Sequence, residues 1–382
     1  MKHQHGFSLV ELMIALTLGL LLSGAAISAF LTVRKVNDTT SGVASLADSG
    51  RFAFEQMGSA VRSAGYLACS ASSDARIDLS PGLPVLISDV GEPLAGYEYT
   101  STGATGTFTL APPYGRATSS GKWASSPTLG GTLDALVYGA SVSGGSVGQP
   151  ISGSDVIATH ESPIGVPALY LTLTASVGSN SLATTLSGSV NSGFASILAA
   201  NKTPVAVVSN CQSAEVFAIG SASGALLSMS TTNATQHLVT AYGAGSHMSL
   251  IDTRIYYVGV GSDGEGALFV LDSNSTSSLS APVELVPDVE NMQVLYGVDT
   301  TGAKAVSEYV TADKVPTTGI TADFNSVIDV KLALLLVGAP GSAVTPTIAP
   351  IFSLLGATIT APVDSKLRAV FTTTFTLRNN AG

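Results

Sequence analysis

The chain begins with a short polar segment followed by its longest apolar stretch. Residues 1–6 read MKHQHG, and the 27 residues from Phe7 to Val33 contain a single charged side chain, Glu11. About 20 apolar residues suffice for a helix to span a bilayer, so the pattern predicts a transmembrane helix over residues 7–33. A carboxylate inside such a helix costs on the order of 2.5–3.5 kcal/mol even on the mildest insertion scale. Glu11 is therefore a candidate functional residue, for which we expect a positively charged partner.

The helical periodicity continues beyond the apolar run. Eight residues recur at steps of three and four, the spacing of one helix face: Val36, Thr40, Val43, Ala47, Gly50, Phe54, Met57 and Val61. We therefore predict an amphipathic continuation of the helix over residues 34–66, with Gly65 at a C-cap position. Glycine inside a helix costs up to ~1 kcal/mol relative to alanine, so Gly42, Gly50 and Gly58 predict local bends.

Residues 67–382 have the pattern of a β-rich domain. Short β-branched and aromatic segments, bounded by Gly, Ser, Asn or Pro, predict antiparallel strands at residues 136–138, 155–158, 168–174, 205–208, 215–219, 254–260, 267–271, 283–286, 294–298, 327–337 and 368–377. Two of them, 254–260 and 267–271, flank the turn GSDGEG and predict a hairpin. Residues 80–130 and 139–153 are predicted to be Gly/Ser/Thr/Pro-rich loops, and 338–366 is an apolar insertion to which the pattern gives no role. The fold class is therefore α+β, a long N-terminal helix packed on an antiparallel β-sheet-rich domain.

The sequence GFSLVELM, Gly6–Met13, resembles the type IV prepilin leader. The resemblance implies that a prepilin peptidase cuts after Gly6 and methylates Phe7, while Glu11 stays in the mature chain and pairs with a terminal ammonium during assembly. Such a cut leaves the apolar helix attached as an anchor, unlike the cut of an ordinary signal peptide. The alternative is an uncleaved signal anchor with a tolerated polar residue.

Orientation in the membrane follows from this resemblance and not from charge. Lys2 precedes the apolar run and Arg34 and Lys35 follow it, so the positive-inside count is nearly balanced. The resemblance implies a single-pass protein of the inner membrane with its body in the periplasm, and possible residence in the pilus fibre or at the cell surface.

Four further segments are similar to the PilW family of minor pilins: SGRFAFEQMGSAVRSAGYLAC (49–69), PVAVVSNCQSAEVFAI (204–219), ELVPDVENMQVLYGVD (284–299) and RAVFTTTFTLRN (368–379). The similarity implies a non-catalytic role: the protein joins other minor pilins and the major pilin in a membrane complex that primes pilus assembly, and it can occupy the fibre tip. The partners implied are prepilin peptidase, these pilins and inner-membrane lipid. The alternatives are a tip-exposed adhesin or DNA-capture subunit, and a minor pseudopilin of type II secretion.

The two cysteines, Cys69 and Cys211, are the right number for one disulfide in an oxidising compartment. A bridge between them would close a long loop, which is worth roughly 4–5 kcal/mol on the chain-entropy model. Two unpaired buried thiols are the alternative. The net charge of −10, with only 16 thinly spread basic residues, argues against a general nucleic-acid surface.

Neither an enzyme nor a metal site is predicted, and we expect no cofactor. A G-x-S-x-G pattern places Ser146 near Asp155 and His160 in sequence, but it lies in a Gly/Ser loop instead of the strand-to-helix turn that a hydrolase needs. The three histidines beyond the leader have no ligand spacing.

Two groups of carboxylates could be either binding sites or ordinary solvated surface. Asp263-Gly264-Glu265 and Asp272-Ser273-Asn274 lack a full calcium-loop pattern and are expected to be solvated turns. The cluster Glu284, Asp288 and Glu290 is expected to be an exposed acidic face and a candidate contact with a basic neighbour.

Overall fold

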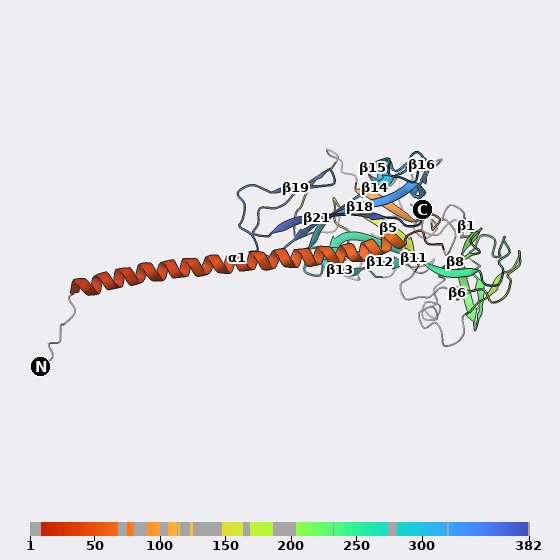
Figure 1. Ribbon diagram of the computed structural model, residues 1–382, viewed down its shortest axis with the longest axis horizontal. Coiled ribbons are helices and arrows are strands. Elements are labelled where there is room, and N and C mark those ends of the chain that lie inside the picture. The colour runs from red at the N-terminus through yellow and green to blue at the C-terminus, as the bar shows by residue number, and fades with distance from the viewer. Residues whose placement is uncertain are drawn as a thin grey trace.

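The structure is a computed structural model of the 382-residue chain. It describes residues 9–67, 75–79, 90–99, 106–112, 114, 123–124, 147–162, 169–185, 204–231, 233–273, 281–318 and 321–380. A single long helix extends from one end of a β-rich body, as Figure 1 shows.

Helix α1, Leu9–Ser63, is 55 residues long and runs without interruption through Gly42, Gly50 and Gly58. Its N-terminal part projects away from the body and its C-terminal part lies along it (Figure 1). The helix ends where the sequence predicts: Ser63 is its last residue, and Gly65 has the left-handed φ of +72° that glycine adopts without strain.

The larger sheet has the strand order β4-β2-β5-β11-β8-β9-β10-β7 among the described residues, with β1, β6, β12 and β13 paired to it off this path. Its strands are β1 Ala75–Ile77, β2 Leu94–Tyr99, β4 Trp123–Ala124, β5 Val156–Glu161, β6 Leu169–Tyr170, β7 Ser181–Ala183, β8 Val205–Ser209, β9 Ala214–Ser223, β10 Leu226–Met229, β11 His247–Val260, β12 Gly266–Ser273 and β13 Val283–Pro287. Its pairs are antiparallel except β1 with β9.

A second sheet, in the order β15-β14-β18-β21, lies beside α1. Its strands are β14 Val289–Val298, β15 Glu308–Val310, β18 Val327–Val337 and β21 Arg368–Thr376. Smaller elements complete the described part: β3 Thr107–Thr109, β16 Thr317–Thr318, β17 Thr321–Ala322, β19 Ile351–Leu354, β20 Ala357–Thr360, and the 3-10 turns η2 Ala312–Lys314 and η3 Phe324–Ser326. β19, β20 and β3 form a three-stranded sheet, and β16 pairs with β17.

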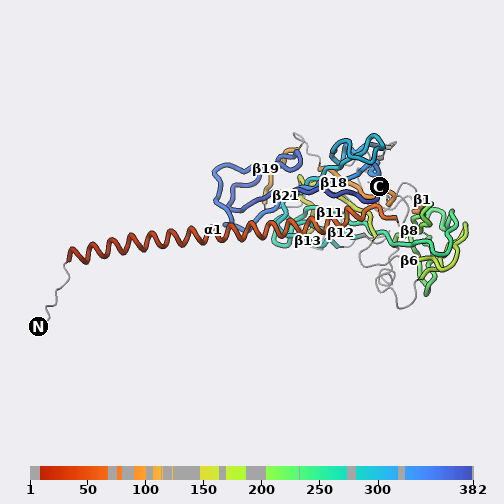
Figure 2. The backbone as a smooth tube through the Cα atoms, in the orientation of Figure 1, coloured from red at the N-terminus to blue at the C-terminus, as the bar shows by residue number. Residues whose placement is uncertain are grey.

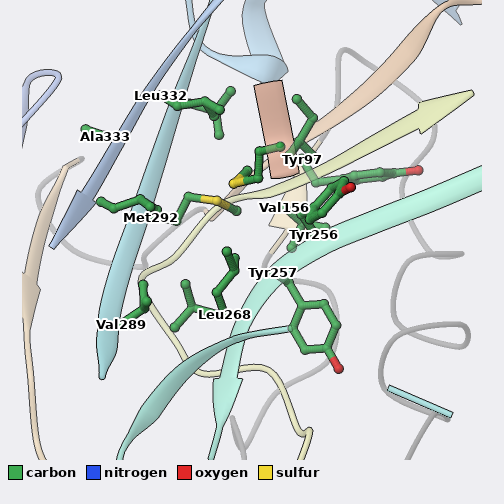
Figure 3. Close-up of a cluster of buried hydrophobic side chains, with 14 of the residues drawn as sticks. Tyr97, Val156, Tyr256, Tyr257, Leu268, Val289, Met292, Leu332 and Ala333 are labelled. Atoms are coloured by element: carbon green, nitrogen blue, oxygen red, sulfur yellow. The ribbon is translucent and has the colours of Figure 1, made fainter. Parts of the chain in front are cut away.

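The main core lies between these two sheets and the C-terminal part of α1. Figure 3 shows Tyr97, Val156 and Leu268 of the larger sheet close to Met292 and Leu332 of the second sheet. Ala53, Met57 and Val61 of α1 belong to the same cluster. A separate cluster around Phe217 and Tyr242 fills the end of the body far from the N-terminus, which is green in Figure 2. The body therefore has one core built on the helix and another away from it.

Most of the predicted strands are confirmed. The hairpin forms between β11 and β12, and residues 327–337 form β18 with the predicted bounds. The predicted strand at residues 136–138 lies outside the described residues. The loop predicted at residues 80–130 is wrong in three places, because β2, β3 and β4 lie there. The longest, β2, is buried and paired with β5, because Leu94, Tyr97 and Tyr99 supply a core surface. The insertion at 338–366 contains the hairpin β19–β20.

Candidate functional site

The N-terminal half of α1 exposes a continuous apolar surface. Every side chain from Leu9 to Asp38 is exposed, and an 18-residue window of the helix reaches a mean hydropathy of 2.1 with none of it buried. Among the described residues, α1 is the one helix long and apolar enough to cross a membrane. A helix that is apolar all round needs an apolar environment, which is either lipid or other helices.

The hydroxyl groups on this surface are already satisfied by the helix itself. Each donates to a backbone carbonyl three or four residues earlier: Thr17 to Ile14 at 3.0 Å, Ser23 to Gly19 at 2.8 Å, Ser28 to Ala25 at 2.9 Å and Thr32 to Ser28 at 2.9 Å. Transferring a hydroxyl group from water into hydrocarbon without a hydrogen bond costs several kcal/mol of free energy, roughly the cost measured for transfer into an apolar solvent. These bonds therefore make the exposed half compatible with the interior of a bilayer.

Glu11 lies in the first turns of α1, on the exposed surface. The processing residues Gly6 and Phe7 lie outside the described residues, so their roles and the pairing of Glu11 stay predictions. The first turn of α1, which contains Glu11, is at the end of the helix far from the body (Figure 1).

The C-terminal half of α1 is fixed to the body through closely packed glycines. A Cβ added at Gly50 would lie 3.2 Å from Cγ of Phe371, and one at Gly58 would lie 2.6 Å from Cζ of Phe375. Phe375 also makes an edge contact with Phe54, at 6.3 Å between ring centroids, and the Arg62 guanidinium lies 5.3 Å from its centroid. The glycines thus let strand β21 approach the helix backbone.

The predicted buried face of the helix is correct only from Gly50 to Val61. Gly50, Met57 and Val61 are buried as expected, but Val36, Thr40, Val43 and Ala47 are exposed. Between residues 39 and 46 the contact with the body lies on the neighbouring face, through Thr39, Gly42 and Leu46. The reason is that the body reaches this stretch through Ser342, whose carbonyl accepts from the Thr39 hydroxyl at 3.1 Å.

Strand β5 holds the end of the helix. The Gly65 N–H donates to the His160 carbonyl at 2.9 Å, and the Ser63 hydroxyl donates to Oε2 of Glu161 at 2.6 Å. Arg254 pairs with Glu161 at 2.7 Å. Burial raises the pKa of Glu161, and the bonds from Ser63 and Arg254 oppose that rise. The helix therefore ends in a bonded junction and not in a free hinge.

Cys211 lies in the turn between β8 and β9, with a left-handed φ of 67° and its N–H donating to the Ser209 hydroxyl at 3.1 Å. Cys69 lies outside the described residues. Its flanks point to the same place: Leu67 packs in one cluster with Ala214, and Ala75 pairs with Ala214 in the β1–β9 ladder. Both ends of the segment that contains Cys69 therefore lie beside the start of β9, close in sequence to Cys211. The Cys69–Cys211 bridge stays a prediction that these contacts support.

The residues considered for hydrolysis are held in structural roles. Ser146 lies outside the described residues. Asp155 accepts from the backbone N–H groups of Tyr99, at 3.1 Å, and Val294, at 2.9 Å. His160 makes its hydrogen bond with the Thr253 hydroxyl at 2.9 Å, and burial lowers its pKa to about 4. The bonds of Asp155 join β5 to β2 and β14, and those of His160 join β5 to β11.

The acidic face expected at Glu284, Asp288 and Glu290 is corrected by the structure. Glu290 is buried and accepts from Nε and Nη2 of Arg368 at 2.6 and 3.0 Å. Arg368 also binds Asp364, at 2.7 Å from Nη1. A buried charge needs such a partner, and here the partner lies 78 residues away in the sequence. Glu290 is thus part of the link between β14 and β21 and is unavailable to a neighbouring protein.

The sequence reasoning missed a pocket of about 300 Å³ beside β2 and β14. Glu98, Asp155, Asp313 and Lys314 line it, together with the turn at Leu355 and Gly356. The carboxyl groups of Glu98 and Asp155 are hydrogen-bonded to each other, and burial raises the pKa of both. The only sequence signal was the buried-strand pattern of LAGYEY, which places Glu98 on a strand. Among the described residues no group of three or more His, Cys, Asp or Glu side chains is arranged to hold a metal ion.

Comparisons with known proteins find sequence similarity at the N-terminus and in the C-terminal third of the chain. Residues 1–27 match the family described as the prokaryotic N-terminal methylation motif, and residues 255–379 match the family described as type IV pilus-assembly protein W. Among solved structures, a type IV-like pilin from Thermus thermophilus is 23% identical over 35% of this chain and 70% of its own, with a TM-score of 0.21. A search of curated proteins finds no match.

The long apolar helix, the β-rich body and the match to the methylation motif make the architecture of the chain pilin-like. Residues 255–379 are similar to the family of type IV pilus-assembly protein W, and this similarity covers the C-terminal third of the chain.

Proposed function

We propose that this protein is a minor pilin that helps prime the assembly of a type IV pilus from the inner membrane. The observation that carries the proposal is the division of α1. Its first half is an apolar helix with Glu11 near the start, and its second half is fixed to the body by β21 and β5. In a subunit built in this way, the apolar half of α1 can move from lipid to contact with other helices while the body keeps its fold.

The proposed mechanism begins with storage in the bilayer. Residues 7–33 hold the processed subunit there, and assembly replaces lipid contacts with contacts between helices. Glu11 sets the axial position by pairing with the N-methylated Phe7 ammonium of a neighbouring pilin. Because α1 is continuous and its end is bonded to the body, a displacement of the apolar half moves the whole subunit.

N-terminal processing is the first test. We expect mass spectrometry of the membrane-derived protein to show a mature chain that begins with N-methyl-Phe7, and Gly6→Val to block the cut. An intact Met1 in cells with active prepilin peptidase would contradict the proposal.

The role of Glu11 is the second test. Glu11→Ala should insert and be processed normally, but it should reduce the number of sheared surface pili or the amount of this subunit in them. Glu11→Asp, shorter by one methylene, should give an intermediate result. Asp38→Ala is the matched control, because it removes an exposed carboxylate of the same helix outside the apolar run. Normal pili with normal amounts of the Glu11→Ala subunit would disprove the charge-pairing mechanism.

A further inference from the structure

The segment from Ala339 to Val363 lies at the end of the body nearest the exposed half of α1. We call it the membrane arm. It includes β19 and β20, and Figures 1 and 2 show this blue region reaching along α1 toward its N-terminal end. Its position is fixed at Ser342, whose carbonyl accepts from the Thr39 hydroxyl at 3.1 Å and whose Cβ lies 3.4 Å from the place of a Cβ at Gly42.

This contact places the arm close to the surface of the membrane that α1 would cross. Thr39 lies six residues after Val33, the last residue of the apolar run, so the two are separated by about 9 Å along the helix at a rise of ~1.5 Å per residue. The headgroup layer on each side of a bilayer is roughly 5–7 Å thick. A helix of about 27 apolar residues is longer than the hydrocarbon core is thick, and such helices tilt in the bilayer. The tilt brings one side of the body closer to the lipid.

The surface of the arm suits an interfacial location. Val344, Ile348, Ile351 and Val363 are 70%, 79%, 68% and 51% exposed. The sequence from Gly338 to Val363 contains no charged residue. The charges that follow are held by the body, since Asp364 binds Arg368 at 2.7 Å and Lys366 binds Glu265 at 2.7 Å. Single exposed aliphatic residues are common on protein surfaces. An uncharged segment that exposes four aliphatic side chains beside a membrane-spanning helix is unusual and indicates an interaction site.

We propose that the membrane arm inserts these aliphatic side chains into the headgroup–acyl boundary of the leaflet on the body's side while α1 resides in the bilayer. The proposal rests on the membrane anchoring in the proposed function. The arm then supports the body at a second point, so that the subunit waits for assembly at a fixed tilt. Leaving the membrane requires the release of both α1 and the arm.

Depth-dependent fluorescence quenching tests the proposal on the full-length protein. Ile348→Trp is reconstituted at low density into phosphatidylethanolamine–phosphatidylglycerol vesicles with acyl chains brominated either near the headgroup or near the chain end. The matched control is Val177→Trp, because Val177 is 63% exposed but belongs to the end of the body far from the N-terminus. Leu20→Trp reports insertion of α1. The unsubstituted protein gives the background of Trp123, which is the single native tryptophan.

We expect bromine near the headgroup to quench Trp at position 348 at least twofold more strongly than Trp at position 177, and bromine near the chain end to quench Trp at position 20. Equal quenching at 348 and 177, with Trp at position 20 quenched, would overturn the membrane arm and leave the anchor standing. An unquenched Trp at position 20 would overturn the anchor and the arm together. If 348 is shielded from acrylamide only in membranes that contain other pilins, a protein neighbour covers the arm and lipid does not.

Discussion

The two halves of α1 use the same residue types for opposite purposes. A Cβ added at Gly19 or Gly24 would meet nothing within 4 Å. One at Gly50 would be in tight contact with the ring of Phe371, and one at Gly58 would collide with the ring of Phe375. In the packed half, glycine is required by the approach of β21. In the exposed half, small residues leave room for neighbouring helices, the usual way in which helices associate in membranes. Glycine in this helix therefore lies on two contact surfaces. One is covered by β21 of the same subunit, and the other is exposed.

The largest effect that we expect concerns the junction where the packed half ends. Cys69→Ser should lower the free energy of unfolding by about 4 kcal/mol, because the predicted bridge to Cys211 closes a long loop. Urea unfolding in detergent measures this loss, and N-terminal processing should remain normal. Cys211→Ser should give the same loss, and the double variant no more. Reaction of both thiols in denatured, non-reduced protein would refute the bridge.

The second largest loss of stability should come from a bulky side chain at Gly58. Gly58→Leu should cost about 3 kcal/mol, because the new side chain meets a ring held between Phe54 and Arg62 and overpacking of a core is destabilising. Gly24→Leu is the matched control in the exposed half and should leave the unfolding of the body unchanged. Equal effects of the two substitutions would show that the halves do not differ as described.

Acidification should weaken the packed half through His160, which is buried beside the helix end. The pKa of His160 in the folded state is about 4, below the ordinary value of about 6.5, so the unfolded chain binds a proton first as the pH falls. This group's contribution to stability should therefore fall by about 2 kcal/mol from pH 7.5 to pH 5.

Other buried groups titrate in the same range, so the difference between variants isolates this effect. His160→Gln cannot gain the proton, and its pH profile should be flatter than that of the unsubstituted protein by this amount. His237→Gln, at an exposed histidine, is the matched control for the substitution itself. A His160→Gln profile parallel to that of the unsubstituted protein would contradict the assignment.

The smallest effect should come from the hydrogen bond at the last residue of α1. Ser63→Ala removes the donor to Glu161 and should cost about 1 kcal/mol, the usual net value of such a bond. Ser59→Ala changes an exposed serine one turn earlier and should stay within roughly 0.5 kcal/mol of the unsubstituted protein. A Ser63→Ala protein as stable as the Ser59→Ala control would show that the junction does not depend on this bond.

The comparison also explains what the sequence could predict. The helix, its end at Gly65 and the hairpin of β11 and β12 are local, so periodicity and turn residues were sufficient. The burial of Glu290 could not be predicted, because it depends on Arg368, which only the pairing of β14, β18 and β21 brings close. The helix face between residues 36 and 47 was wrong for a similar reason, since the contact there is made by Ser342.

The candidate site divides in the same way. Glu11 and the apolar surface were readable from charge and hydropathy alone, because both are local features of one exposed helix. The pocket at Glu98 and Asp155 was not, because segments far apart in the sequence build it, among them β2, β14, the region of η2, and the turn between β19 and β20.

The packing of β21 on α1 has a consequence for the order of events during synthesis. The strand begins at Arg368 and covers a helix that ends at Ser63, so the first and last elements of the body complete each other. Until the C-terminal strand has been synthesised, the glycine face of the helix lacks the cover that Phe371 and Phe375 provide. A chain that stops before Arg368 keeps the residues that bond α1 to Ser342 and His160, but it lacks the packing of Phe371 and Phe375 on the helix.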